Sequence, residues 1–180
     1  MNFLLAVGQL YIPSSLKKRR LRELFDVTAG AFRCQAPGLE GIPFDECLRR
    51  YALFTRDKAE EFIHQGNDIE IKLRLYNGAS VLAQRLKSDF HIDSVEDVMK
   101  MAKIVYRILN IDFESKLQGE VLIRRCFFST YYSKAVCRMI SSLDEGFLEG
   151  LSGGTFRFSQ RITDGKACCL ARLSFNRSSS

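Results

Sequence analysis

The chain has 180 residues, of which 46% are hydrophobic, and it contains 14 phenylalanines and no tryptophan. This length can bury one hydrophobic core and is short for two, so we expect a single domain over residues 1–180. Much of the formal net charge of +6 lies in residues 17–22, a basic run that could contact phosphates or an anionic lipid surface. Because no recognition helix, zinc finger or RNA-binding motif accompanies this run, we interpret it as a solvated helix face and do not expect nucleic acid as a partner.

Residues 1–12 are apolar but too few to span a bilayer, which takes about 20 apolar residues. Positive charge follows this segment, whereas a secretory signal carries its positive charge in front. The six cysteines have no regular spacing and fit reduced thiols better than a disulfide framework. We therefore expect a cytoplasmic protein without a transmembrane segment.

Helical spacing of apolar residues predicts four helices within residues 1–109. Ser94, with Asp97 three positions later, has the arrangement of a helix N-cap, and Gly78 suggests close packing of one helix against a neighbour. The predicted spans are residues 14–34, 43–54 with a continuation over 57–65 after a kink, 68–87 and 94–109.

From residue 110 the periodicity changes. Residues 111–117 and 121–129 are β-prone and flank a short polar turn, which predicts an antiparallel hairpin. Residues 134–148 have helical spacing, and the glycines that follow should end that helix, with Gly150 or the Gly153-Gly154 pair at positive φ.

The last part of the chain predicts a second hairpin. Residues 156–163 and 167–175 are expected as strands joined by a two-residue turn at Asp164-Gly165, and residues 178–180 are expected to fray. The expected fold class is α+β. A helical N-terminal half (residues 1–109) packs on a four-stranded antiparallel sheet, and residues 110–176 have β-β-α-β-β order.

Residues 126–169 resemble two known families. The first resemblance is to the C-terminal half of vinyl-reductase-like small-molecule-binding domains. It is carried by Val136-Cys137, then residues 146–151, an aromatic strand and Gly165-x-x-Cys168. This resemblance implies a domain that binds a small ligand. A further cysteine of that family's pattern, on the strand before the final hairpin, is replaced here by residues 159–162, so we do not expect its metal site to be transferred whole.

The second resemblance is to the 2-aminothiazoline-4-carboxylate hydrolase family. It implies a cysteine-dependent hydrolase of a carbon–nitrogen or thiazoline bond, with Cys137 as the nucleophile. The residues that carry this resemblance are Cys126-Phe127, Cys137, Asp144, Arg161-x-Thr163, Gly165 and Cys168.

The cysteines place the candidate site between helix 134–148 and the sheet. Cys137 is one turn into its helix, where unpaired amides and the helix dipole lower the pKa of a thiol, so it is the candidate catalytic residue; a buried thiol that acts only as a small hydrophobe is the alternative. Cys126 lies mid-strand and either approaches Cys137 or Cys168 or packs in the core. Cys168 and Cys169 are adjacent in a strand and point to opposite faces, so only one can join the site, and the motif match selects Cys168.

Arg161 and Asp144 allow two interpretations. They form a buried carboxylate–guanidinium pair, which we slightly favour, or Arg161 holds a substrate carboxylate in a bidentate fork. Phe147 belongs to an aromatic set that is mostly core, with members near the mouth of the sheet lining an apolar pocket. The candidate ligand-binding residues are Cys126, Cys168, Arg161, Asp144 and Phe147.

A metal centre and a cysteine–histidine pair are weaker candidates. Cys126, Cys137 and Cys168 could bind zinc through thiolates, but paired Cys-x-x-Cys spacings are absent, so zinc is possible but not favoured and the cofactor is unknown. A cysteine enzyme needs a base near its thiol, and the only histidines, His64 and His91, lie in the helical half.

The leading prediction is a domain that binds a small molecule, partly apolar or carboxylate-bearing, in a cysteine-lined pocket between helix 134–148 and the sheet. The hydrolase is the alternative, and an interaction module that uses the basic helix is a third option. A homodimer is compatible with all three.

Overall fold

The computed structural model describes residues 12–116 and 118–175. The predictions for the apolar segment at residues 1–11 and for fraying at residues 178–180 fall outside the described residues. The elements in chain order are α2 (Ser14–Phe32), α3 (Phe44–His64), α4 (Asp68–Asp89), α5 (Val95–Ile108), β1 (Ile111–Ser115), β2 (Glu120–Cys126), η1 (Phe127–Thr130), α6 (Lys134–Ile140), α7 (Ser142–Ser152), β3 (Thr155–Gln160), η2 (Ile162–Asp164) and β4 (Cys169–Ser174).

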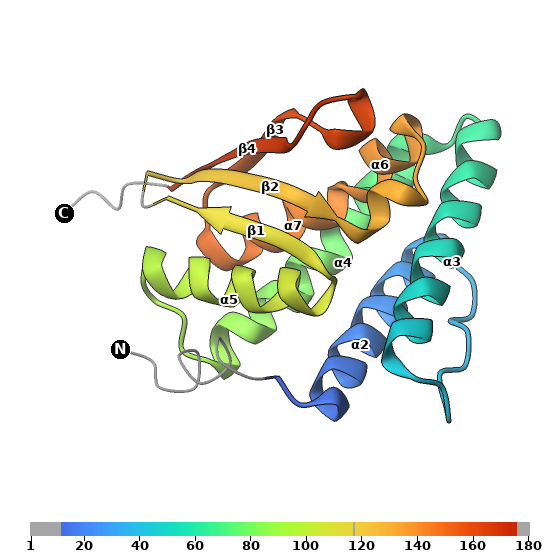
Figure 1. Cartoon of the computed structure of the whole chain (residues 1–180), viewed down its shortest axis with the longest axis horizontal. Helices are drawn as coiled ribbons and strands as arrows, with labels where there is room; N and C mark the ends of the chain where they lie inside the picture. Colours follow the sequence, from blue (N-terminus) through green and yellow to red (C-terminus); the bar gives the residue numbers. More distant parts are fainter. Residues whose placement is uncertain (1–11, 117, 176–180) are drawn as a thin grey trace.

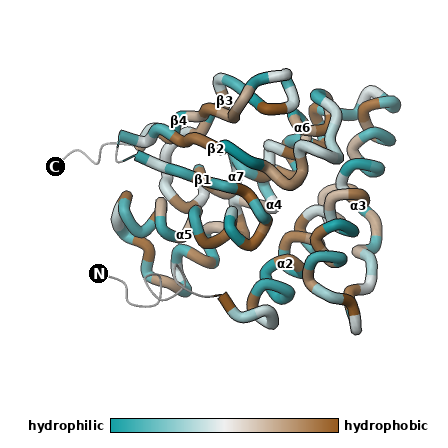
Figure 2. Tube along the Cα trace, viewed as in Figure 1, coloured by the Kyte–Doolittle hydropathy of each residue, from teal (hydrophilic) through white to brown (hydrophobic). Residues whose placement is uncertain are grey.

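The long helices follow their predicted spans closely. Ser94 caps α5, accepting a hydrogen bond from the backbone N–H of Asp97 at 3.1 Å as predicted. The second helix is not interrupted at the predicted kink, because α3 is one helix over Phe44–His64. Within it the Thr55 hydroxyl donates to the Tyr51 carbonyl oxygen at 2.8 Å. In Figure 2 hydrophobic and hydrophilic residues alternate along α3 and α5, as expected for helices with one buried face.

The four strands form one antiparallel sheet in the order β1-β2-β4-β3. The central pair joins the two hairpins, with Val121 opposite Ala171 and Ile123 opposite Cys169. Along β4, Cys169, Ala171 and Leu173 are buried while the residues between them are exposed, so one face of the sheet covers the core. Figure 1 shows the strands as one layer above α5, α7 and α4, with α2 and α3 side by side at one end. The chain therefore has the predicted α+β fold.

The helix predicted over residues 134–148 is two helices, α6 and α7, that meet at Ser141. The apolar residues on either side continue in one helical phase, so their spacing conceals the break. The Ser141 hydroxyl donates to the Cys137 carbonyl oxygen at 2.7 Å. A serine bonded back to its preceding turn in this way competes with regular helix hydrogen bonding.

The predicted two-residue turn at Asp164-Gly165 is also wrong. β3 ends at Gln160 after a register shift, and a loop containing η2 leads to β4. This loop has contacts outside the hairpin, because Lys134 and Arg138 of α6 each lie 3.3 Å from the Asp164 carboxylate. Arg161 and Thr163 therefore lie in a loop rather than on a strand.

Two glycines allow α7 to lie directly against α4. A Cβ at Gly146 would lie 2.1 Å from the carbonyl oxygen of Tyr76, and a Cβ at Gly150 would lie 2.8 Å from that of Ser80. Gly146 and Gly150 are four residues apart and share one helix face, so the backbones of the two helices approach without intervening side chains. Of the glycines predicted at positive φ, Gly153 is confirmed (φ 69°) and ends α7, whereas Gly150 is helical and serves this contact.

We expect Gly146→Ala to destabilise the protein by about 3 kcal/mol, the upper part of the range for an overpacked site, because two backbones must separate. Gly30→Ala is the matched control, since Gly30 is also helical and a Cβ there meets no atom within 4 Å. That control should gain up to about 1 kcal/mol from helix propensity. Urea denaturation of both variants measures the difference, and equal stabilities would contradict the α4–α7 contact.

Candidate functional site

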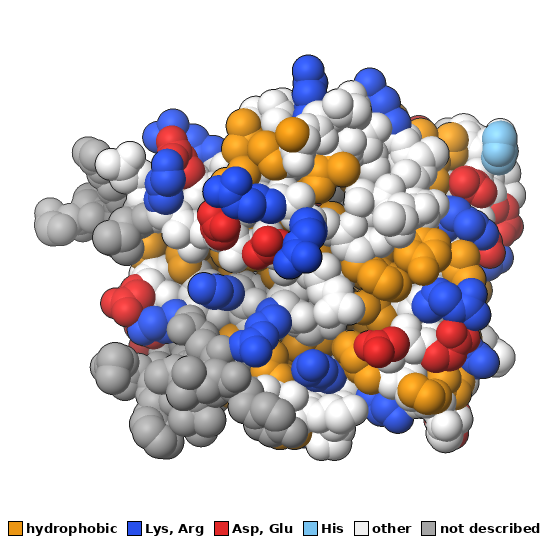
Figure 3. Space-filling view, viewed as in Figure 1, with side chains coloured by type: hydrophobic (Ala, Val, Ile, Leu, Met, Phe, Trp, Pro, Cys, Tyr) orange, Lys and Arg blue, Asp and Glu red, His pale blue; other side chains and the backbone are white. Residues whose placement is uncertain are grey.

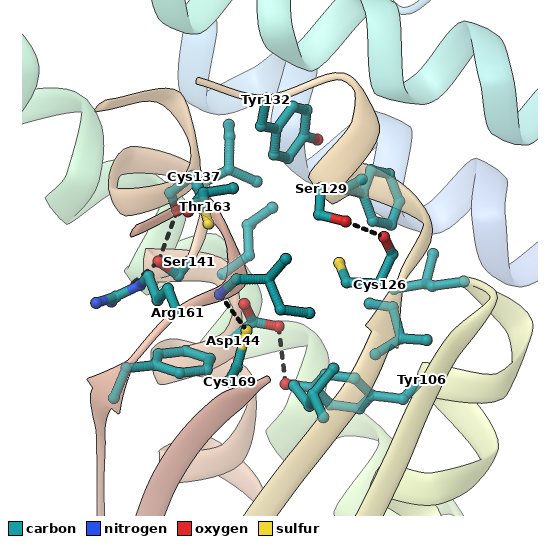
Figure 4. Close-up of a pocket in the computed structure, with 18 of the residues that line it drawn as sticks. Tyr106, Cys126, Ser129, Tyr132, Cys137, Ser141, Asp144, Arg161, Thr163 and Cys169 are labelled. Carbon is teal, nitrogen blue, oxygen red and sulfur yellow. Dashed lines mark hydrogen bonds between the residues drawn. The ribbon is translucent and has the colours of Figure 1, made fainter. Parts of the chain in front are cut away.

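A cavity of about 100 Å³ lies between the inner face of the sheet and the helices beneath it. In Figure 4, Cys126 and Ser129 lie on one side, and Arg161, Ser141 and Cys137 lie on the other. Its apolar lining includes Val105, Leu109, Ile111, Ile123, Phe128, Ile140, Leu143, Phe147 and Phe158. Its other polar or thiol-bearing lining residues are Tyr51, Tyr106, Tyr132, Asp144, Thr163 and Cys169.

Asp144, on the first turn of α7, is the acidic residue of this lining. Burial raises the pKa of its carboxyl group to about 6, although the hydrogen bond from Tyr106 and the positive charge of Arg161 act in the opposite direction. The Tyr106 hydroxyl donates to Asp144 Oδ1 at 2.8 Å, and its own pKa is raised well above the usual value, first by burial and then by the neighbouring carboxylate. Asp144 can therefore change protonation state close to neutral pH.

Arg161 lies at the same end of the cavity. Its guanidinium carbon lies 4.6 Å from the centre of the Phe158 ring, and its Nη2 donates to Ser141 Oγ at 3.3 Å. Its Nε is buried and has no hydrogen-bond partner among the described residues. In the described part of the chain no ion pair joins Arg161 to Asp144, so the carboxylate–guanidinium pair that the sequence slightly favoured is wrong.

Thr163 adds a second unsatisfied group. Its hydroxyl oxygen is buried and lies beside the Cys137 thiol, where it acts to lower a thiol pKa that burial raises. The pair does not meet hydrogen-bond geometry, so this hydroxyl oxygen has no partner within residues 12–116 and 118–175. Two buried polar atoms without partners in one lining are unusual, because an unsatisfied buried group costs about 1–3 kcal/mol.

Cys169, and not the predicted Cys168, joins Cys126 and Cys137 in the lining. The two neighbours do differ in surroundings as expected, since Cys169 is buried while Cys168 lies outside the cavity and accepts a hydrogen bond from Gln160 Nε2 at 3.4 Å. The alternation of Cys169 with Ala171 and Leu173 is the signal that could have identified the inward-facing cysteine.

The surroundings of Cys137 do not support its predicted activation. Burial raises the pKa of its thiol, and burial raises the pKa of the Cys126 thiol to about 12. The backbone N–H of Cys137 already donates to the Ser133 carbonyl oxygen at 2.9 Å, so it is not one of the free amides of the helix start. Burial has the largest effect on the pKa of both thiols and favours their protonated form.

Neither histidine supplies a base for the thiols. His64 is exposed at the end of α3 and His91 is exposed beyond α4, and both lie outside the cavity lining. Within residues 12–116 and 118–175, no group of three His, Cys, Asp or Glu side chains is arranged to hold a metal ion. The alternative zinc site of Cys126, Cys137 and Cys168 is therefore not assembled.

The sequence did not identify several polar residues of the lining. Tyr106 lies on the buried face of α5, at helical spacing from Ala102 and Met99. This spacing in the sequence could have predicted that its side chain faces the core beneath the sheet. Tyr132 lines the cavity and its hydroxyl lies 2.5 Å from Thr55 Oγ1. This contact joins residues far apart in the chain, and no local pattern indicates it.

The basic run lies on α2 and is largely paired within the protein. Arg19 and Arg20 form ion pairs with Glu23, and Arg22 forms one with Glu40. The Lys17 ammonium lies 5.5 Å from the centre of the Phe44 ring. These contacts fit the solvated helix face that we favoured.

No family model, curated protein or solved structure matches the chain. The resemblances to vinyl-reductase-like domains and to the 2-aminothiazoline-4-carboxylate hydrolase family therefore stay predictions. Among the described helices, none combines the length and the apolar character needed to cross a membrane.

Asp144→Asn should change how stability depends on pH. With a folded pKa near 6 against an ordinary value of 3.8, Asp144 binds its proton more tightly in the folded state. Its contribution is present below the ordinary pKa and is lost as pH rises through about 6. The variant cannot titrate, so its stability relative to the parent should rise by up to about 3 kcal/mol between about pH 4 and pH 7.

Urea denaturation across this pH range measures the effect, and Asp164→Asn is a control of opposite sign. Although burial works in the other direction, Lys134 and Arg138 hold the pKa of Asp164 below its usual value. Its stabilising contribution is present at neutral pH and is lost on acidification, so the control should be less stable than the parent at neutral pH. A parallel response of the two variants would contradict the assignment for Asp144.

Thiol labelling tests the cysteine assignments. After brief iodoacetamide treatment at neutral pH, Cys168 should be alkylated before Cys126, Cys137 and Cys169, because burial raises the thiol pKa of those three and only a thiolate reacts readily. Peptide mapping by mass spectrometry gives the order. Fastest labelling at Cys137 would restore the nucleophile hypothesis.

Proposed function

We propose that this protein binds a small, mainly apolar carboxylic acid in the cavity, as a small-molecule-binding domain of the vinyl-reductase-like type. The observation that carries the proposal is Arg161, a cationic side chain of an otherwise mainly apolar lining, with a buried Nε that has no hydrogen-bond partner among the described residues. Arg161 as a whole is half-buried, but a buried polar atom such as its Nε is costly unless it is hydrogen-bonded. A ligand carboxylate would supply the missing partner.

The size of the cavity limits the ligand. Its volume of about 100 Å³ is below that of an engineered cavity of about 150 Å³ that holds benzene. The space therefore takes the carboxylate and the first carbons of a short aliphatic acid such as hexanoate, against residues such as Ile140, Leu143 and Phe147. The remaining carbons of hexanoate would extend towards the wall that carries Cys126 and Ser129. An apolar wall with a few polar groups is typical of sites that bind small molecules.

Asp144 gives the proposed site a dependence on pH. A ligand carboxylate near Arg161 would also lie near Asp144, because Arg161 is close enough to lower the pKa of that carboxyl group. Negative charge favours the protonated form of Asp144, so ligand binding would take up a proton. Affinity should therefore increase as pH falls from about 8 towards the Asp144 pKa.

The structure offers less support for the hydrolase. A nucleophilic thiol needs a lowered pKa or an adjacent base, whereas burial raises the pKa of Cys137 and both histidines lie elsewhere. The neutral thiols instead suit an apolar wall. All six cysteines are free, which fits the cytoplasmic location predicted from the sequence, and that location is part of the proposal.

Hexanoate binding by isothermal titration calorimetry tests the function. Arg161→Met keeps the apolar stem and removes the charge, so the affinity should fall about 10- to 100-fold, the scale of one charge-assisted hydrogen bond. Arg172→Met is the matched control, because Arg172 is exposed on the outer face of β4, and its affinity should equal that of the parent. Hexanoate that binds equally well to both variants, or not at all to the parent, would refute the proposal.

A further inference from the structure

A basic groove lies directly outside the cavity. It has a volume of about 770 Å³ and is lined by α5, β1, β2, η1 and the loop before β4. Its charged lining residues are mainly cationic: Lys103, Arg107, Arg124 and Arg125 against Asp112. In Figure 3, lysine and arginine side chains gather on the face that carries α5, β1 and β2.

The groove and the cavity share one wall. Ile111, Cys126, Ser129 and Ile162 line both spaces, so the cavity and the groove lie on either side of these residues. Figure 4 places Cys126 and Ser129 on the side of the cavity opposite Arg161. A ligand that holds Arg161 at one end would therefore direct its other end towards this wall and the groove behind it.

The arginines of β2 are available to an anion. Arg124 donates to Glu114 at 3.0 and 3.3 Å, and Arg125 lies 3.8 Å from Asp112. Their side chains are 59% and 87% exposed, and exposed ion pairs of this kind contribute little stability. An anion with several oxygens can replace such partners at small cost, and planar guanidinium groups match phosphate oxygens in bidentate geometry.

We infer that the groove is a phosphate-binding subsite, and that the ligand is a short apolar carboxylic acid bearing a phosphate or phosphonate group at its other end. The inference rests on the proposed function and extends it. The carboxylate lies at Arg161, the methylene chain fills the cavity and crosses the shared wall, and the phosphate group lies among Lys103, Arg124 and Arg125.

The test compares 6-phosphonohexanoate with hexanoate, two probes that differ only in the phosphonate group. By calorimetry at low salt, the parent protein should bind 6-phosphonohexanoate at least about 10-fold more tightly, and the gain should shrink as salt screens the exposed arginines. The double variant Arg124→Gln/Arg125→Gln should lose this gain and bind hexanoate as the parent does.

Arg49→Gln/Arg50→Gln is the matched control, an adjacent exposed pair of arginines that pairs with Glu46 on α3. It should keep the full gain, and melting temperatures of both double variants verify folding. Inorganic phosphate serves as a third probe and should bind more weakly than 6-phosphonohexanoate.

Three outcomes overturn the inference. The first is equal affinity for the two organic probes, which leaves the proposed function standing if hexanoate binding still depends on Arg161. The second is a gain that survives the Arg124/Arg125 change. The third is binding of 6-phosphonohexanoate no tighter than inorganic phosphate, which reduces the groove to an isolated anion site. Failure of hexanoate to bind in the parent protein is a separate result and counts against the proposed function.

Discussion

The contact between the backbones of α4 and α7 is the constraint on which the site depends. Gly146 and Gly150 remove the side chains that would hold the helices apart, while other positions of α7 place Leu143, Asp144 and Phe147 in the cavity lining. Glu149 secures the C-terminal end of the same helix, accepting hydrogen bonds from the Tyr76 hydroxyl at 2.6 Å and the Phe156 amide at 2.8 Å. One short helix is thus fixed to α4 on one side and to β3 at its end, which leaves its remaining face to define the floor of the cavity.

Burial decides the chemistry of this cavity. Helix position alone predicts an ionised thiol at Cys137, but removal from water acts on the whole side chain and has the larger effect. The same desolvation raises the pKa of Asp144 only to about 6, because the Tyr106 hydroxyl and the Arg161 charge favour its ionised form. The cysteines therefore form a neutral part of the cavity wall, whereas the Asp144 carboxyl group and the Arg161 guanidinium group can respond to a ligand.

The sequence predicts the helices and the two hairpins well, because the spacing of apolar residues repeats with every helical turn and with every second residue of a strand. It fails where distant residues decide. The Asp164-Gly165 pair is a strong hairpin signal, yet Asp164 lies in a loop, where it pairs with Lys134 and Arg138 of α6. The break at Ser141 is hidden because the apolar phase continues through it. The sequence predicts that the site lies between the 134–148 region and the sheet. It also predicts the lining residues Cys126, Cys137, Asp144, Phe147 and Arg161. The choice between Cys168 and Cys169 required the register of β4.

The strand order β1-β2-β4-β3 bears on how the protein folds. Each hairpin pairs locally, but the β2–β4 pairing joins parts of the chain that α6, α7 and β3 separate. Pairings with large sequence separation form late, because the chain loses entropy before they contribute. Since Ile123 and Cys169 face each other across this junction and both line the cavity, the cavity exists only once the sheet is complete. A ligand there stabilises the finished fold by mass action and slows unfolding while leaving the folding rate almost unchanged.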